Sequence, residues 1–142
     1  GLIASGAATL RSGEKVRIRR VPQGWEHRWR DKVIVTATWW TTPESLVTTN
    51  LNTFFHSYRP KPGDVVLDVG AGFGSEVIEF SRLVGPRGLV VALEPNPIVF
   101  ARLIQAVTAM RLANVWALPL GLGSRPGPLN LALDEDWDAE MV

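Results

Sequence analysis

The sequence predicts an α/β protein built on a parallel β-sheet that is flanked by helices. Two apolar runs, VVLDV at 65–69 and LVVALE at 89–94, have the composition of buried strands, and a stretch with helical spacing follows each of them. Strands and helices that alternate in this way are typical of βαβ units with right-handed crossovers. With 142 residues, of which 46% are hydrophobic, the chain suits one domain with a single core.

The first strand–helix unit contains a glycine-rich turn. The strand at 65–69 leads through DVGAGFG into a helix, and residues 70–74 are named the glycine loop below. Gly85-Pro86 is expected to end that helix, because proline cannot continue it. The inward residues of the helix are predicted to be Val77, Ile78, Phe80, Leu83 and Val84. A strand as apolar as 65–69 is expected to be covered on both faces.

The second unit continues the same pattern toward the C-terminus. After the strand at 89–94, Asn96 can cap a helix that Pro97 begins, because proline lacks the N–H that the first helical position leaves unpaired. NVWALPL at 114–120 is predicted to be a third strand. PLNLALD at 128–134 alternates apolar and polar residues, which predicts an antiparallel edge strand with one covered face.

The N-terminal part is expected to differ from the rest. Residues 1–42 are predicted to form a basic extension or hairpin, in which KVRIRRV (15–21) pairs with KVIVTATW (32–39) around a turn rich in Trp and Arg. A helix is predicted to start at Thr42-Pro43-Glu44 and to pack on the parallel sheet. The second region, 43–142, is expected to be the main domain.

Charge is distributed unevenly along the chain, although the net charge is only +1. Residues 1–62 contain ten Lys and Arg against four Asp and Glu, and residues 63–142 contain five against ten. Basic residues mixed with tryptophans can bind nucleic acid through phosphates and stacked bases. The alternative is a solvated face, with Trp25 and Trp29 covering the core while the arginines stay in water.

Composition excludes several kinds of site. Without cysteine there is no disulfide, thiolate zinc site or cysteine nucleophile, and two histidines are too few for a histidine metal cluster, so we expect no metal site. The acidic tail DEDWDAEMV lacks the spacing of a calcium loop. No apolar run is long enough to span a membrane and the start is a poor secretory signal, so we expect a cytoplasmic protein with no membrane partner.

The glycine loop and Glu94 together predict a ligand that contains adenosine. Asp68 and Glu94 end neighbouring parallel strands, so both are expected at the carboxyl edge of the sheet, where ligands bind and where a carboxylate can accept hydrogen bonds from the ribose hydroxyls. A dinucleotide fingerprint would require Gly or Ala at Ser75, whereas Gly70, Gly72 and Gly74 give G-x-G-x-G. Glu76 in the first turn of the helix would repel a pyrophosphate but tolerate a cationic ligand. These features favour S-adenosylmethionine over a dinucleotide.

These residues also carry a family resemblance. DVGAGFG resembles motif I of the Rossmann-like S-adenosylmethionine-dependent methyltransferases, and the run from PGDVVLDVGAGFG to ANVWALPLGLGSRPGPLNLAL is similar to the FkbM-type branch, many of whose members methylate hydroxyl groups. The similarity covers about 44–133. The family often has Asn where this chain has Gly72, and an acidic residue where it has Ser124.

The resemblance implies a role for each part of the site. Asp68 would hold the ammonium group of S-adenosyl-L-methionine, and the backbone of the glycine loop would approach the cofactor closely. Glu94 would bind the ribose hydroxyls. Pro95 and Asn96 would border the adenine on one side, and Gly121 and Leu122 would line its other side. The cofactor-binding residues implied in this way are Asp68, Gly70, Ala71, Gly72, Gly74, Glu76, Glu94, Pro95, Asn96, Gly121 and Leu122. No catalytic base can be named.

The resemblance further implies that the sequence is the N-terminal, cofactor-binding portion of a longer fold. The sheet flank left open is expected to promote self-association. The expected function is methylation of a small-molecule or sugar hydroxyl. The alternatives are an RNA or other macromolecular methyltransferase that uses the basic N-terminus, a non-catalytic binding module with the same fold, and a dehydrogenase.

Overall fold

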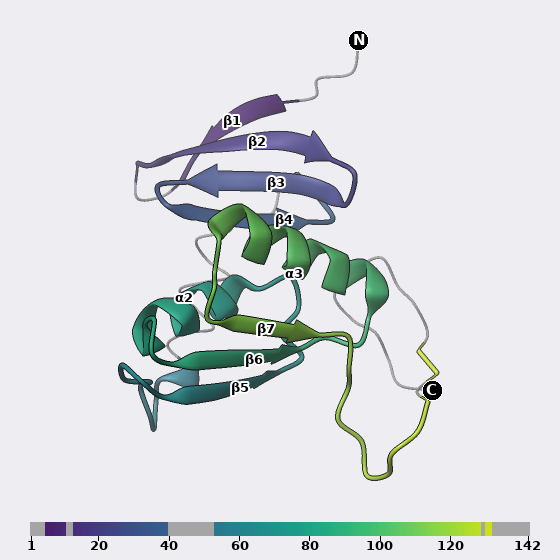
Figure 1. Cartoon of the computed structure of the whole chain (residues 1–142). Coiled ribbons are helices and arrows are strands. Elements are labelled where there is room, and N and C mark those ends of the chain that lie inside the picture. Colours follow the sequence, from purple (N-terminus) through teal and green to yellow (C-terminus); the bar gives the residue numbers. More distant parts are fainter. Residues whose placement is uncertain (1–4, 11–12, 40–52, 129, 132–142) are drawn as a thin grey trace.

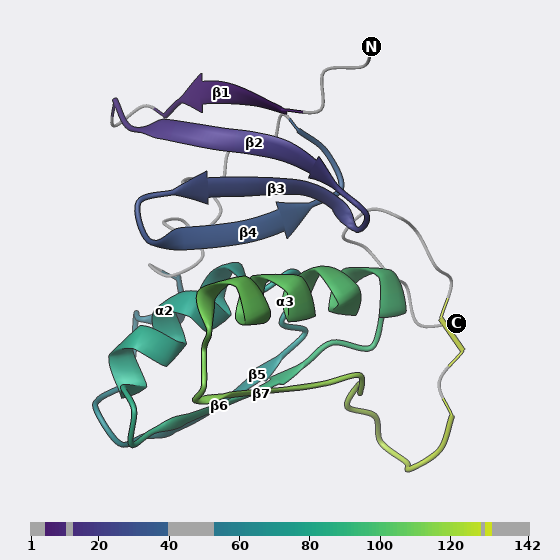
Figure 2. The same cartoon turned by 45° about the horizontal axis from the view of Figure 1, so that its top comes forward.

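Two β-sheets enclose a layer of helices in this protein (Figure 1, Figure 2). The structure, a computed structural model, describes residues 5–10, 13–39, 53–128 and 130–131. An antiparallel sheet of four strands comes first in the chain, and a parallel sheet of three strands follows it. The first sheet comprises β1 (Ser5–Thr9), β2 (Lys15–Val21), β3 (Gly24–Trp29) and β4 (Lys32–Thr36). The second part comprises β5 (Val65–Val69), α2 (Ser75–Val84), β6 (Leu89–Leu93), α3 (Pro97–Met110) and β7 (Val115–Leu118).

The parallel sheet has the order β5-β6-β7, as two successive strand–helix units require. Both helices pack on the same face of this sheet, where Val90, Ala92 and Leu103 are completely buried. The predicted local signals for α3 are confirmed, because Asn96 Oδ1 accepts hydrogen bonds from the N–H groups of Ile98 (3.0 Å) and Val99 (3.4 Å). The structure therefore has the partial Rossmann-like arrangement that the sequence predicts.

The expectation that β5 is covered on both faces is wrong. Its side chains alternate, and Val65, Leu67 and Val69 are 70%, 57% and 51% exposed. Trp116 on β7 is 61% exposed. An apolar run only shows that a strand can be covered on both sides, and in the described part of the chain α2 and α3 cover one side only.

The N-terminal region contains more strands than the predicted hairpin. The segment 24–29, expected to be a turn, is the strand β3, so β2 pairs with β3 and β3 with β4. Two polar residues of β3 are buried because they have partners. Glu26 accepts two hydrogen bonds from Arg19 (2.8 and 2.9 Å), and His27 Nε2 lies 2.9 Å from Thr36 Oγ1. Burial lowers the pKa of His27, so the neutral imidazole is favoured.

One of the two hydrophobic clusters of the protein contains side chains from both halves of the chain. Trp29 and Ile34 of the antiparallel sheet cluster with Phe73 of the glycine loop and Ile78 of α2. Thus Trp29 covers the core and the arginines of β2 and β3 are exposed, as the solvated-face interpretation predicts.

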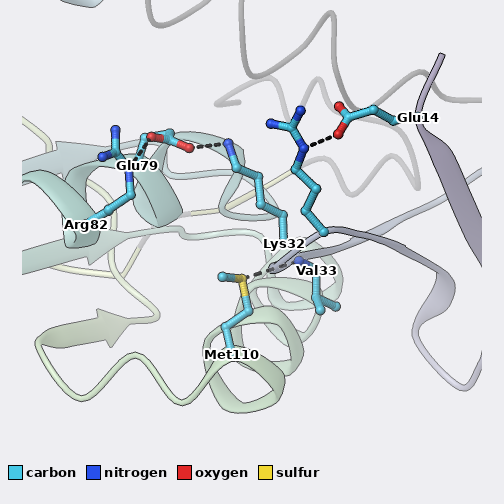
Figure 3. Close-up of polar contacts among 7 residues, drawn as sticks. Glu14, Lys32, Val33, Glu79, Arg82 and Met110 are labelled. Carbon is cyan, nitrogen blue, oxygen red and sulfur yellow. Dashed lines mark hydrogen bonds and ion pairs between the residues drawn. The ribbon is translucent and has the colours of Figure 1, made fainter. Parts of the chain in front are cut away.

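Polar contacts join β4 to the helices (Figure 3). Glu79 of α2 lies between Lys32 of β4 and Arg82, and it pairs with both. The N–H of Val33 points at Met110 Sδ, 3.3 Å away. Because the Lys32–Glu79 and Val33–Met110 contacts join residues distant in sequence, they fix the antiparallel sheet on the helix layer.

Gly24, at the start of β3, is expected to be the most sensitive glycine of this sheet. A Cβ there would lie 2.2 Å from the backbone oxygen of Thr36, and φ is +143°. Gly24→Ala should therefore lower the free energy of unfolding by roughly 2–5 kcal/mol, from the clash and the backbone strain together. Gly13→Ala is the matched control, because φ is +84° but nothing lies within 4 Å, so about 1 kcal/mol is expected. Equal urea midpoints for the two variants would contradict the clash.

Three expectations fall largely outside the described residues. The helix predicted from Thr42 is described only from residue 53 onward. The edge strand at 128–134 is described only at Pro128, Asn130 and Leu131, and the acidic tail lies beyond. Among the described residues, no helix has the length and apolar character that crossing a membrane requires.

Candidate functional site

The candidate site lies at the carboxyl edge of the parallel sheet, where the glycine loop meets the end of β6. The N–H groups of Gly70 and Ala71 both donate to the carbonyl oxygen of Leu93, at 2.9 Å each. Gly70, Gly72 and Gly74 have φ values of +77°, +55° and +90°, a region that favours glycine. The loop therefore uses its glycines to turn sharply from β5 into α2 while it stays bound to β6.

Glu94 connects the glycine loop to the start of α3. Its Oε2 accepts a hydrogen bond from Gly72 N at 3.0 Å, and its Oε1 accepts one from Asn96 N at 2.8 Å. The residue is only 7% exposed. The predicted convergence of Glu94 and the glycine loop is thus present. Each carboxylate oxygen has one of these bonds and can accept another.

Asp68, the penultimate residue of β5, is partly buried and has one buried, unsatisfied carboxylate oxygen. Within the described part of the chain, its Oδ2 is buried without a hydrogen-bond partner. Burial, and then the nearby charges of Glu76 and Glu94, raise the pKa of Asp68 to about 6. An unpaired buried acceptor is costly unless a donor reaches it, so this oxygen marks a position for a donor or a cation.

Glu76 brings a third carboxylate to the same region. It is 5% exposed in the first turn of α2, where the positive end of the helix dipole favours an acid, and Ser75 Oγ donates to its Oε2. In the parts of the chain that the structure describes, no group of three or more His, Cys, Asp or Glu has the geometry to hold a metal ion. Asp68, Glu76 and Glu94 together make an acidic environment that suits an organic cation.

The other predicted residues lie at the same edge of the sheet. Ala71 and Asn96 are buried, and Pro95 between Glu94 and the helix cap is partly buried. Gly121 is partly buried and Leu122 is 57% exposed, beyond β7. The carbonyl oxygen of Leu118, which ends β7, accepts a bond from Glu94 N at 3.1 Å.

Ser75 was not singled out as part of the site from the sequence. Its hydroxyl is bonded to Glu76, and the residue is 1% exposed. Serine is common at the start of a helix, so its presence there does not indicate a role in a site. The sequence showed only that Ser75 stands where a dinucleotide-binding loop would have Gly or Ala.

Gly70 and Gly74 should respond differently to a methyl group, although both have positive φ. At Gly74 a Cβ would lie 2.7 Å from Leu103 Cδ1 in the core, whereas at Gly70 it would meet nothing within 4 Å. Gly74→Ala is expected to destabilise the fold by roughly 2–4 kcal/mol, and Gly70→Ala by about 1 kcal/mol from strain alone. Urea unfolding of both variants measures the difference. A larger loss in Gly70→Ala would contradict the open space at that position.

Known structures share part of this fold. The chain is similar to a SAM-dependent methyltransferase from Aquifex aeolicus, with 28% identity over 63% of this chain and 47% of that one, at a TM-score of 0.52. A candidate rRNA methylase from Clostridium thermocellum matches at 25% identity over 54% and 40% of the two chains, with a TM-score of 0.44. Fibrillarin from Aeropyrum pernix, solved with natively bound S-adenosyl-L-methionine, matches at 20% identity over 83% and 52%, with a TM-score of 0.45.

The similarity to the Aquifex protein identifies the class of fold. The structural neighbours of this chain are S-adenosylmethionine-dependent methyltransferases of the Rossmann-like class. Of the three structures, the Aquifex protein has a TM-score above 0.5. The chain spans about half the length of that protein, 47%. No family model and no curated protein matches the sequence.

Proposed function

We propose that this chain carries the S-adenosyl-L-methionine-binding part of a methyltransferase. The observation that supports the proposal best is the convergence of Asp68, the glycine loop and Glu94 at one edge of a parallel sheet. The resemblance to the Aquifex methyltransferase supports it independently. The activity of the whole protein is part of the proposal, because the chain spans only part of that relative.

The residues at this edge fit the cofactor. The buried oxygen of Asp68 that has no partner among the described residues can accept a hydrogen bond from the ammonium group of the methionine moiety. The space beside Gly70, where a Cβ would touch nothing, lets a ligand approach the backbone. Glu94 keeps acceptor capacity for ribose hydroxyls while its two bonds to Gly72 and Asn96 fix its orientation.

The remaining roles follow from position. Pro95 and Asn96 follow Glu94 and would border the adenine, and Gly121 and Leu122 would cover its other side. Ala71 donates its backbone N–H to the carbonyl oxygen of Leu93 and so holds the loop against the end of β6. Glu76 would add negative charge near the cationic end of the ligand.

The same charges argue against a dinucleotide. A pyrophosphate would have to lie at the start of α2, where Glu76 is buried and Asp68 is close enough for the two charges to interact. Two carboxylates at this point repel an anion, whereas the ammonium and sulfonium groups of S-adenosyl-L-methionine are attracted.

When bound, S-adenosyl-L-methionine supplies an electrophilic methyl group on a positively charged sulfur. The contribution of this chain is to bind and orient the cofactor, so that an acceptor atom can be placed at about 3–3.5 Å from the methyl carbon. A hydroxyl of a small molecule or sugar is the acceptor that the FkbM-type resemblance of the sequence implies. A nucleic acid is the second candidate, and the arginines of β2 and β3 support it.

Isothermal titration calorimetry tests cofactor binding directly. Wild-type protein is expected to bind S-adenosyl-L-methionine and the product S-adenosylhomocysteine, and to give no heat with NAD⁺. Gly70→Ala should weaken the binding, because its methyl group enters the space beside the backbone at little cost in stability. Binding of NAD⁺ in preference to S-adenosyl-L-methionine would favour the dehydrogenase alternative. Absence of binding to either, in a folded protein, would favour the non-catalytic binding module.

A further inference from the structure

A concave surface lies on the antiparallel sheet and extends from there to α3, away from the glycine loop. Two adjoining hollows of about 510 and 480 Å³ share Arg19, Glu26 and Arg28 in their linings. Arg17 lines the first hollow, and Ala101 and Ala109 of α3 line the second. This surface is named the arginine groove.

The arginine groove has more positive than negative charge. Arg17 lies directly opposite Arg28 in the pairing of β2 with β3, and like charges in this arrangement destabilise a sheet. Glu26 is the acid in the linings, and Arg19 already binds it through two hydrogen bonds. Among the described residues Arg17 takes part in no ion pair, and Arg28 reaches Glu26 only at 3.5 Å. An anion between Arg17 and Arg28 would relieve their repulsion.

The spacing of the arginines suits a ligand with several anionic groups. Arg17 and Arg19 are two residues apart on one strand, so their backbones are about 7 Å apart and their side chains leave the same face. The side chains of Arg19 and Arg28 are 60% and 45% exposed, so their guanidinium groups are accessible. Arginine donates paired hydrogen bonds that match the geometry of phosphate oxygens.

The arginine groove also leads toward the candidate site. Its second wall is α3, which begins beside Glu94, because Asn96 caps the helix and donates its backbone N–H to Glu94. Ala101 is five residues from that cap, a rise of about 7.5 Å along the axis. The side chains that α3 contributes to this wall carry no charge, so they do not repel a phosphate chain: Ala101, Ile104, Gln105, Thr108 and Ala109.

We propose that the arginine groove binds the phosphate backbone of a single-stranded nucleic acid and directs one end of it toward the Glu94 edge. A positively charged groove can follow the phosphate backbone of a single strand, and the arginines of these two adjoining hollows form such a groove. The groove binds phosphate whether or not the cofactor is present. That the strand is the methyl acceptor rests on the proposed function.

Fluorescence anisotropy with a labelled 16-nucleotide RNA of mixed sequence tests the groove without cofactor. The double variant Arg17→Gln/Arg28→Gln is expected to raise the dissociation constant about tenfold, and to reduce the slope of log K against log salt by about 1.4. The matched control is Arg20→Gln/Arg87→Gln, which removes the same charge. Arg20 lies over the ring of Trp25 and Arg87 lies in the turn before β6, so neither lines the groove. This control should change the dissociation constant less than twofold.

Two further measurements decide between outcomes. Ala109→Glu, which places a carboxylate on the α3 wall, should also weaken RNA binding, whereas Ser57→Glu at another exposed position should not. Equal loss in both double variants would show that only net charge matters, and would overturn the proposal. So would poly-L-glutamate binding as tightly as RNA at equal salt.

Calorimetry with S-adenosyl-L-methionine on the same proteins separates the two proposals. Arg17→Gln/Arg28→Gln should bind the cofactor as wild type does, since neither residue is part of the candidate site. RNA binding without cofactor binding would support the groove and contradict the proposed function. Cofactor binding without RNA binding would support the proposed function and contradict RNA binding in the arginine groove.

Discussion

Glu94→Ala is expected to abolish detectable binding of S-adenosyl-L-methionine and to lower the free energy of unfolding by about 2–5 kcal/mol. The carboxylate accepts bonds from the N–H groups of Gly72 and Asn96, so its removal leaves both amides without their present partner in a buried region. It also removes the group proposed to bind the ribose hydroxyls. Calorimetry measures the first effect and urea unfolding the second.

Glu79→Ala is the matched control for this variant. Glu79 is likewise a buried glutamate, 6% exposed, but it binds Lys32 and Arg82 and faces the antiparallel sheet instead of the glycine loop. Its loss should destabilise the protein and leave cofactor affinity unchanged at a temperature where both variants are folded. If Glu79→Ala lost affinity as completely as Glu94→Ala, the effect would be one of stability only.

Asp68→Asn is expected to stabilise the protein without ligand at pH 8 and to weaken cofactor binding. The pKa of Asp68 is about 6 in the folded protein and 3.8 for an ordinary aspartate, so the native state binds more protons between these values. Stability therefore falls as pH rises from about 4 to about 6 and stays low above that, by roughly 3 kcal/mol in total. Asparagine removes this dependence. Urea unfolding at pH 5 and pH 8 measures it.

Ligand binding should have the opposite dependence on pH. As Asp68 ionises near pH 6, its affinity for an ammonium group increases, so wild-type protein should bind S-adenosyl-L-methionine more tightly at pH 8 than at pH 5. Asp68→Asn should lose most of that difference. Its control is Asp64→Asn, because bonds from Lys61 N and Tyr58 lower the pKa of this exposed carboxyl. Asp64 therefore stabilises the fold above its pKa and loses that contribution in acid, with no expected effect on the cofactor.

The parallel half of the fold was largely predictable because its signals are local. The apolar runs, the glycines and the cap at Asn96 each depend on a few adjacent residues, and the structure has strands and helices where these signals place them. The convergence of Glu94 with the glycine loop follows from the same order, since neighbouring parallel strands end at one edge.

The sequence-based predictions were wrong where contacts between different strands and layers decide the structure. Segment 24–29 was interpreted as a turn rich in Trp and Arg between two strands. Its polar residues Glu26 and His27 are nevertheless buried, because Arg19 and Thr36 on the flanking strands bind them. The exposure of Leu67 depends on which layers cover the sheet, and an apolar run in the sequence does not predict that arrangement. The raised pKa of Asp68 results first from burial and then from the charges of Glu76 and Glu94, and both depend on the three-dimensional arrangement of residues that the sequence shows only one by one.

The position of Phe73 couples the glycine loop to the antiparallel sheet. This residue leaves the loop between Gly72 and Gly74 and is buried with Trp29 and Ile34, on the side of the helix layer away from the parallel sheet. The loop therefore cannot open without withdrawing an aromatic ring from that core. The two halves of the chain consequently share one cooperative unit, in which the antiparallel sheet restrains the glycine loop through Phe73.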